Sequence, residues 1–375
     1  MIDRRALIGA AGAVALLPRD AGAQGRVLVN SITLDGDRAW IAARIGKGEP
    51  RLFVIDTGAN VSLINNDLAR QLQLKEIARS NLRGVGGVSE FPYYDGGELT
   101  FASGLRIPAM LFAGTQARLG TDAVGALSAG LFTTYDSDLD FAKGEWRAYP
   151  DGRPDFAGLR QLKSRFSGDP VRGDRILADA TIGGFSGEFL VDTGAPGHIM
   201  LEGRASARSG LWSADRPYVP SEARGIGRGA VPRRIVRVDT LKLGPMTLHR
   251  PLVGLSAPGT PSHDGDGFLG LRVLERLHLT TQVKSRTLWI APNGRAARPD
   301  RYPMSGLWLD RKGDAITIAD VGTGSPAAAA GLKIGDRVTG AGWDDLTRKL
   351  GGPAGSEVAF DVGTRRVVLK LADYL

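Results

Sequence analysis

At 375 residues the chain is longer than one compact core usually holds, so two or three domains are expected. It contains no cysteine, which excludes disulfides, thiolate catalysis and cysteine-ligated metal centres. Its 52 glycines favour turn-rich β structure over a helical bundle, and its net charge of +8 is spread along the chain without a basic block. Such dispersed charge is typical of a generally basic protein, so no nucleic-acid partner is assigned.

The first predicted element is a targeting segment at residues 1–24. Arg4-Arg5 precedes an apolar run at 6–17, and the small residues at 21–23 suit a signal peptidase. As a helix the apolar run would be about 18 Å long, well short of a membrane's hydrocarbon core. We therefore expect an exported protein, periplasmic or secreted, with no stable membrane span after cleavage. The paired arginines leave the choice between twin-arginine and ordinary secretory export open.

An internal repeat dominates the chain after this segment. Leu-Phe-Val-Ile-Asp-Thr-Gly-Ala at 52–59 recurs as Phe-Leu-Val-Asp-Thr-Gly-Ala at 189–195. The glycine-rich segment at 83–86 recurs at 224–227, in the same order along the chain. A repeat of this length predicts two copies of one structural unit.

Each copy is predicted to be a β lobe. Apolar runs such as 40–45 and 176–182 have the length of strands and are separated by glycine-rich turns. The lobes are expected at 25–150 and 176–295. Residues 151–175 are rich in Gly, Pro, Arg and Asp, which predicts a polar connector.

Both copies place an aspartate at the end of an apolar strand, Asp56 in the first and Asp192 in the second. One Asp-Thr-Gly sequence suits an ordinary turn. Two at the same place in a repeated lobe indicate that pseudo-twofold packing brings the carboxyls face to face. Carboxyls in hydrogen-bond reach share one proton, so the ionised one can activate a water while the protonated one donates to an amide carbonyl. This chemistry requires no metal or other cofactor, and none is expected.

Residues 26–292 resemble the pepsin and retropepsin superfamily of aspartic proteases, through the two Asp-Thr-Gly-Ala motifs and the Phe268-Leu269-Gly270 element. The resemblance implies that Asp56 and Asp192 form a catalytic dyad and that a peptide or protein substrate lies extended in a cleft between the lobes. The residues implied to support the dyad are Thr57, Gly58, Thr193 and Gly194.

Two further features follow from the repeat. The glycine-rich segments fall where flap hairpins are expected, and strand patterns after them disfavour a nucleotide-binding loop. The candidate flap residues are Gly84, Gly86, Gly225 and Gly227. Ser128 stands where the second copy has Gly270, and this departure from the family pattern puts the geometry near Asp56 in question.

A different pattern begins at about residue 303. A strand at 316–321 precedes Ser325-Pro326, a capping residue followed by proline at the first helical position, and a further helix and closing hairpin follow. The Ser-Pro-Ala…Ala-Gly-Leu-Lys-x-Gly-Asp sequence makes residues 303–375 resemble a bacterial PDZ domain. The resemblance implies that a bound peptide adds as a strand and that one loop holds its carboxylate. The residues of that loop are Gly306, Leu307, Trp308 and Leu309.

The predicted fold is mainly β: a bilobal pepsin/retropepsin-like acid protease fold followed by a small α+β PDZ domain. The predicted function is that of an exported aspartic endopeptidase whose PDZ domain captures a peptide or protein segment. Two alternatives remain, an inactive scaffold that binds peptides in the same cleft and groove, and a processing enzyme of narrow scope. A monomer is expected, because one chain carries both aspartates.

Overall fold

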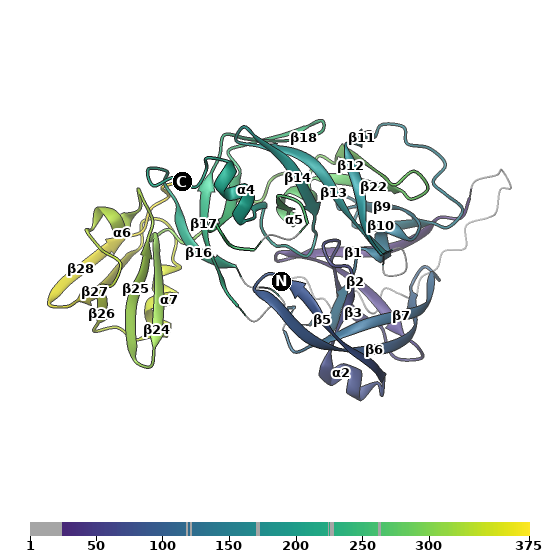
Figure 1. The fold of residues 1–375 in the computed structure, drawn as a ribbon, viewed down its shortest axis with the longest axis horizontal. Helices are drawn as coiled ribbons and strands as arrows, with labels where there is room; N and C mark the ends of the chain where they lie inside the picture. Colours follow the sequence, from purple (N-terminus) through teal and green to yellow (C-terminus); the bar gives the residue numbers. More distant parts are fainter. Residues whose placement is uncertain are drawn as a thin grey trace.

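The computed structural model describes residues 25–117, 119–120, 122–169, 173–223, 225, 229–261 and 264–375. The predicted targeting segment at 1–24 therefore lies outside the described residues. The fold is mainly β, as predicted, with two lobes side by side and a smaller module next to β16 and β17 at one end (Figure 1). In the described part of the chain no helix has the length and apolar character needed to cross a membrane.

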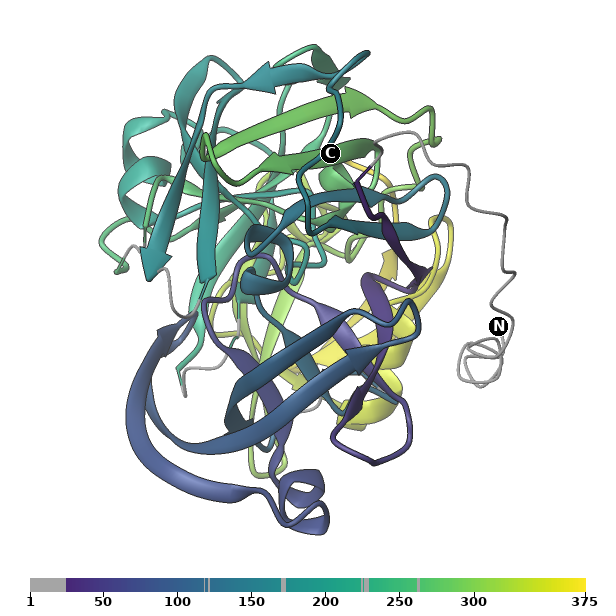
Figure 2. The ribbon, with the colours of Figure 1, turned by 90° about the vertical axis from the view of Figure 1, so that its right-hand side faces the viewer.

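The described residues of the amino-terminal lobe form ten strands and two short helices. They are β1 (Leu28–Asp35), β2 (Arg38–Ile45), β3 (Arg51–Ile55), β4 (Ser62–Asn65), α2 (Asn66–Gln71), β5 (Lys75–Gly84), β6 (Gly87–Phe101), β7 (Arg106–Thr115), β8 (Gly125–Leu127), α3 (Gly130–Thr133), β9 (Asp136–Asp140) and β10 (Glu145–Tyr149). The β5–β6 hairpin is long and curved, and forms the blue ribbon at the edge of this lobe in Figure 2.

The carboxyl-terminal lobe repeats this order. It contains β13 (Gly173–Ile182), β14 (Phe185–Val191), β15 (Ile199–Leu201), α4 (Gly203–Arg208), β16 (Val219–Ala223), β17 (Val231–Arg237), β18 (Thr240–Leu243), β19 (Met246–His249), β20 (Leu252–Ser256), β21 (Gly267–Leu269), α5 (Leu271–Leu274), β22 (Leu277–Gln282) and β23 (Thr287–Pro292). In each lobe the strand before the aspartate pairs in parallel with a short strand ending in Leu, β3 with β8 and β14 with β21. The repeat in the sequence is thus a repeat in the fold.

The last strands of the second lobe join the sheet of the first. β22 pairs antiparallel with β9, and Thr280 lies opposite Asp138. These two residues correspond at the repeat offset of 142, so the pseudo-twofold axis passes through this pair. The shared sheet runs β11-β23-β22-β9-β10-β1 before it continues into the first lobe. It fixes the two lobes relative to each other.

The segment at 151–175, predicted to be a connector, also contains strands. β11 (Arg160–Leu162) pairs with β23, and β12 (Ser164–Asp169) pairs with β13. β11 is the edge strand of its sheet, and edge strands tolerate the polar residues that suggested a loop. The partner of β11 is distant in the sequence, and the partner of β12 follows it directly along the chain. The composition of the segment does not reveal either pairing.

Residues after 303 form a module with its own hydrophobic core. Its elements are β24 (Leu307–Lys312), β25 (Ala315–Val321), α6 (Pro326–Ala329), β26 (Arg337–Thr339), α7 (Trp343–Leu350), β27 (Glu357–Val362) and β28 (Arg365–Lys370). Ser325 caps α6 by accepting the amide of Ala328 at 3.1 Å, as the Ser-Pro sequence predicts. The five strands form one sheet in chain order.

Tyr218 fixes this module to the second lobe. Its hydroxyl donates to the Asp320 carboxylate at 2.9 Å and lies 3.0 Å from the Val321 carbonyl oxygen. The hydroxyl of Tyr374 donates in turn to the carbonyl oxygen of Tyr218 at 3.0 Å. The chain's last residues therefore lie between the module and the lobe.

Candidate active site

Asp56 follows directly on β3, which is almost entirely buried, and Asp192 follows directly on β14, in which Phe189 and Val191 are buried. Their amides donate to the carbonyl oxygens that end the parallel partner strands, Asp56 to Leu127 at 2.9 Å and Asp192 to Leu269 at 3.0 Å. Each carboxylate accepts two amides of its own loop, at 3.1–3.2 Å for Asp56 and 2.9–3.1 Å for Asp192. Both side chains thus have a fixed orientation.

The two threonines lock the loops together. The amide of Thr57 donates to Thr193 Oγ1 at 3.1 Å, and the amide of Thr193 donates to Thr57 Oγ1 at 3.0 Å. Each hydroxyl donates across to the other lobe, Thr57 to the Val191 carbonyl and Thr193 to the Ile55 carbonyl, both at 2.7 Å. Both threonines are buried, so this symmetric set of four bonds holds the lobes in register.

The glycines of the two motifs bring the carboxyls together. A Cβ atom on Gly58 would lie 2.4 Å from Cγ of Asp192, and one on Gly194 would lie 2.4 Å from Cγ of Asp56. Real Cβ atoms are not found so close to another carbon, so only glycine fits at either position. Each carboxyl therefore packs against the backbone of the opposite loop, and the two acids face each other across the pseudo-twofold axis.

The two carboxyls differ in their affinity for a proton. Burial, followed by the negative charge of Asp56, raises the pKa of Asp192 to about 8. Burial also raises the pKa of Asp56, but the positive charge of Arg38 is the largest effect that opposes this. Because the charge of Asp56 raises the pKa of Asp192, a proton shared by the pair is held more strongly by Asp192 than by Asp56.

Arg38 is a site residue that the sequence analysis missed. It begins β2 and donates from Nη1 to the carbonyl oxygen of Gly194, which lies against the Asp56 carboxyl. A signal was present, because Arg38 lies 18 residues before Asp56 and Arg175 lies 17 before Asp192. The two arginines have different partners in the structure, because Arg175 forms an ion pair with Asp264 and not with the dyad loops. This asymmetry makes the two halves of the dyad chemically distinct.

The two predicted flap segments are hairpin tips that meet. Gly84 pairs with Gly87 at the end of the β5–β6 hairpin. Between β16 and β17, the amide of Gly229 donates to the Gly86 carbonyl at 2.8 Å, and Gly225 lies against Val85. Gly227 lies outside the described residues. The β16–β17 hairpin extends toward the β5–β6 hairpin in Figure 1, so each lobe supplies one side of this contact.

Ser128 fits its position without strain. Its amide donates to Ser62 Oγ at 3.0 Å, and the two hydroxyls lie 3.2 Å apart. At the matching position in the second lobe, a Cβ atom on Gly270 would lie 2.2 Å from the carbonyl oxygen of Gly197. The first lobe has room for a side chain where the second has none, which explains the departure from the family pattern.

These two positions should respond differently to substitution. Gly270→Ala is expected to lower the free energy of unfolding by about 3 kcal/mol, because the rigid Gly197 backbone must move. Ser128→Gly removes only one hydroxyl contact and should cost about 1 kcal/mol. Denaturant unfolding of both variants measures the difference. Equal losses would show that the local geometry around the two residues is the same.

The four residues of the predicted carboxylate loop lie where the module begins. Gly306 has a φ of 74° and packs against Ser325 and the Tyr374 hydroxyl. The Leu307 amide donates to Ser305 Oγ at 3.2 Å, and the Leu307 side chain is part of the module core. Trp308 and Leu309 are half-buried at the start of β24.

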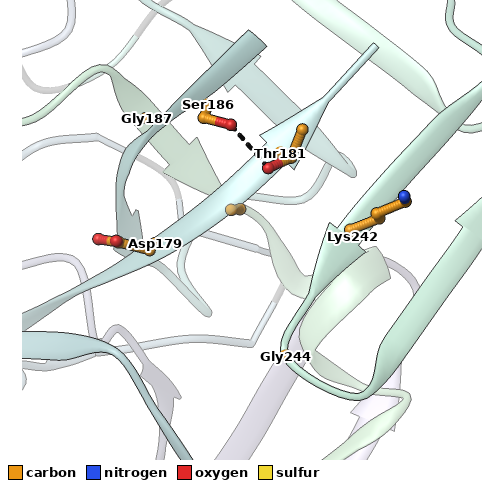
Figure 3. Close-up of a pocket in the computed structure, with 7 residues that line it drawn as sticks. Asp179, Thr181, Ser186, Gly187, Lys242 and Gly244 are labelled. Atoms are coloured by element: carbon orange, nitrogen blue, oxygen red, sulfur yellow. Dashed lines mark hydrogen bonds between the residues drawn. The ribbon is translucent and has the colours of Figure 1, made fainter. Parts of the chain in front are cut away.

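A hollow of about 410 Å³ lies elsewhere on the second lobe, and no dyad residue lines it (Figure 3). It is lined by Asp179 and Thr181 of β13, Ser186 of β14 and Lys242 of β18. The Thr181 and Ser186 hydroxyls bond to each other at 2.8 Å, and Asp179 pairs with Lys163 at 2.6 Å. Asp179, Thr181 and Ser186 therefore already have partners, and the hollow contributes no residue to the dyad.

Comparisons with known proteins found one family model and several solved structures that are similar to this chain. The family model described as aspartyl protease matches residues 41–122 and 178–273. No curated protein sequence matches the chain. Among solved structures, an aspartic proteinase from Irpex lacteus is 13% identical with a TM-score of 0.46, over 73% of this chain and all of that one. Basic 7S globulin from soybean is 11% identical with a TM-score of 0.43, over 72% of this chain and 96% of that one.

The two segments matched by the family model lie in the two lobes, one in each. The first contains Asp56 and the second contains Asp192, each with its strand and Asp-Thr-Gly loop. Both lobes of this chain are therefore similar to the aspartyl protease family across the residues that build the paired carboxyls.

Proposed function

We propose that this protein is an exported aspartic endopeptidase that hydrolyses peptide bonds with a water activated by Asp56 and Asp192. The observation that carries the proposal is the pair of opposed carboxyls, each held by two backbone amides and by the threonine interlock. The difference in proton affinity assigns their roles. The match to the aspartyl protease family model supports the same chemistry.

In this mechanism the ionised Asp56 accepts a proton from a water molecule as the water oxygen attacks the carbonyl carbon of the scissile amide. Asp192 donates its proton to the carbonyl oxygen, so no full negative charge develops there. When the tetrahedral intermediate collapses, the C–N bond breaks and Asp56 returns its proton to the leaving nitrogen. Asp192 recovers its own proton from the new carboxyl group. The dyad ends in its starting state.

The test is cleavage of an unfolded protein substrate by the purified protein between about pH 3 and pH 9, a range that spans both carboxyl titrations. Mass spectrometry should identify internal cuts. A peptide carrying a hydroxyl in place of the scissile carbonyl should block them, because it mimics the tetrahedral state. Absence of cleavage throughout the range would favour the alternative, a scaffold that binds peptides without hydrolysing them.

The charge of Arg38 should determine the pH at which kcat falls on the acidic side of the pH profile. Arg38→Gln removes the positive charge that lowers the pKa of Asp56, so the limb should move up by about one pH unit. Arg38→Lys keeps the charge and should leave the limb close to that of the wild type. The measurement is kcat against pH for the three enzymes. Three coincident acid limbs would show that this charge does not act on the dyad.

The proposal also covers residues 303–375 as a PDZ domain that binds a peptide or protein segment. β24 is at the edge of the sheet and, among the described strands of the module, pairs only with β25, so a peptide could add beside it. A labelled peptide with a free carboxyl terminus should bind the full chain more tightly than the same peptide amidated. Equal binding would argue against carboxylate recognition by the loop at Gly306.

The proposal of export rests on the sequence of residues 1–24, and the proposed location is the periplasm or the medium. Expression of the full chain in a bacterium, followed by fractionation and amino-terminal sequencing, tests it. The expected product begins near Gln24. Full-length protein retained in the cytoplasm would contradict export.

A further inference from the structure

A second pocket, of about 290 Å³, lies in the carboxyl-terminal lobe and is lined mainly by basic side chains. Its lining includes two histidines and four arginines but one carboxylate, Asp300. The basic residues are His198, His249, Arg250, Arg272, Arg276 and Arg298. This volume is at the lower end of the range typical of small-molecule sites.

Most of these charges are balanced within the described residues. Arg272 pairs with Asp37 at 2.8 Å, and Arg298 pairs with Glu275 at 2.8 Å. Asp300 is shared between His198 at 3.3 Å and Arg237 at 2.7 Å. The single carboxylate of the lining is therefore already engaged with two basic groups.

Arg276 is different. Its guanidinium has no ion-pair partner among the described residues, and its Nε is buried without a hydrogen-bond acceptor there. A buried charged donor that lacks an acceptor is costly, so a polar group at this position would be stabilising. The chemistry that a guanidinium matches best is an oxyanion.

Arg250 provides a second, independent indication. It adopts a φ of 51°, one of three non-glycine residues with positive φ in the described chain. Such backbone conformations are uncommon and cluster at ligand sites. Its side chain donates to a carboxylate oxygen of Leu375, the last residue of the chain, at 3.3 Å, and has no other partner among the described residues. Arg250 is also among the residues that line the pocket.

We propose that this pocket binds a small, multiply charged oxyanion, either a phosphate compound or a polycarboxylate, with Arg276 and Arg250 as its main ligands. His198 and His249 add donors at the same wall. The two ligand classes share the planar or tetrahedral oxygen pattern that arginine recognises. The proposal does not depend on hydrolysis by the dyad.

The pocket is nevertheless connected to the candidate active site. α5 carries Arg272, whose amide donates to the Gly197 carbonyl at 3.2 Å, and Gly270 donates to the His198 carbonyl at 2.7 Å. Residues 195–198 follow directly on the loop of Asp192. A bound anion would therefore contact the segment that supports one half of the dyad.

Isothermal titration of the full chain with inorganic phosphate, and separately with citrate, tests the proposal at fixed ionic strength. One of the two should bind at a single saturable site, and the tighter one identifies the ligand class. Arg276→Gln should weaken that binding at least about tenfold, because a charge-assisted contact is lost. Arg44→Gln, at an exposed position on β2, removes the same charge and should change nothing.

Two observations would overturn the proposal. One is the absence of saturable binding of both anions up to about 10 mM, since a specific site binds more tightly than this. The other is equal weakening by Arg276→Gln and Arg44→Gln, which would indicate general attraction to a basic protein. Should Arg276→Gln fail to fold, Arg250→Gln replaces it. NMR resonances of the histidine side chains show where the anion binds. Those of His198 and His249 should shift as the anion is added, whereas that of His278, beside Asp138, should not.

Discussion

Asp56→Asn and Asp192→Asn are each expected to lower kcat for peptide hydrolysis by at least about a thousandfold. A carboxamide keeps the shape and the amide contacts of the side chain but neither accepts nor holds the catalytic proton. Because the two carboxyls act as one unit, the double variant should be no slower than either single variant. The measurement is the rate of cleavage of one peptide substrate, with Asp314→Asn, at an exposed turn of the module, as the matched control.

Although Asp192→Asn should lose activity, we expect it to be more stable than the wild type at pH 8. The raised pKa means that the folded protein keeps the Asp192 proton, whereas the unfolded chain releases it above a pH of about 4. The stability conferred by this proton is therefore present at low pH and is lost as the pH rises toward about 8, by up to about 1.4 kcal/mol per pH unit. Asp192→Asn escapes this loss, so at pH 8 it should unfold at a higher temperature than the wild type.

Measuring both kcat and the melting temperature of the Asn variants distinguishes a loss of catalysis from a loss of folding. An inactive Asp192→Asn protein that is more stable than the wild type at pH 8 has lost a catalytic group and not its structure. Activity retained in either Asn variant would contradict the dyad mechanism. Equal pH dependence of the melting temperature in wild type and Asp192→Asn would show that the Asp192 carboxyl is not protonated in the folded state.

The candidate site could be predicted from the sequence because its main features are local. A short apolar strand, an acid, a hydroxyl residue and a glycine follow one another at both Asp56 and Asp192, and the repeat relates them. The repeat also predicted two similar lobes, and the mainly β fold is confirmed. Local order along the chain was sufficient to predict both.

What the sequence did not reveal depends on contacts between distant residues. The pairing of β22 with β9 joins strands about 140 residues apart, and no local pattern distinguishes it from pairing within one lobe. Arg38 reaches the dyad because it donates to the carbonyl oxygen of Gly194 in the other lobe. Arg175, which precedes Asp192 by a similar number of residues, forms an ion pair with Asp264. Which of two equivalent arginines faces the dyad is decided by loops that the repeat does not conserve.

Ser128 shows the same limit at one position. The second lobe has Gly270 at the matching position, where a Cβ atom would lie 2.2 Å from the carbonyl oxygen of Gly197. The first lobe instead places Ser62 beside it, and the two serines share hydrogen bonds. The partner of a buried hydroxyl lies 66 residues away, so the sequence could show the departure but not its consequence.

The threonine interlock should contribute to the stability of the interface between the lobes, in addition to the sheet that the lobes share. Thr57→Val keeps the volume of the side chain but leaves the buried amide of Thr193 without an acceptor and the Val191 carbonyl without a donor. Two unsatisfied buried groups should lower the free energy of unfolding by about 3 kcal/mol. Thr193→Val should cost as much, because it removes the equivalent bonds to Thr57 and Ile55.

Thermal and denaturant unfolding of both variants measure this loss, with Thr247→Val on an exposed face of β19 as the control, expected within about 0.5 kcal/mol of the wild type. The double variant Thr57→Val/Thr193→Val should lose less than the sum of the single variants, because the four bonds form one network. Strict additivity would mean that the two threonines act independently. Losses no larger than that of the control would mean that the loops of Asp56 and Asp192 are held together by other contacts.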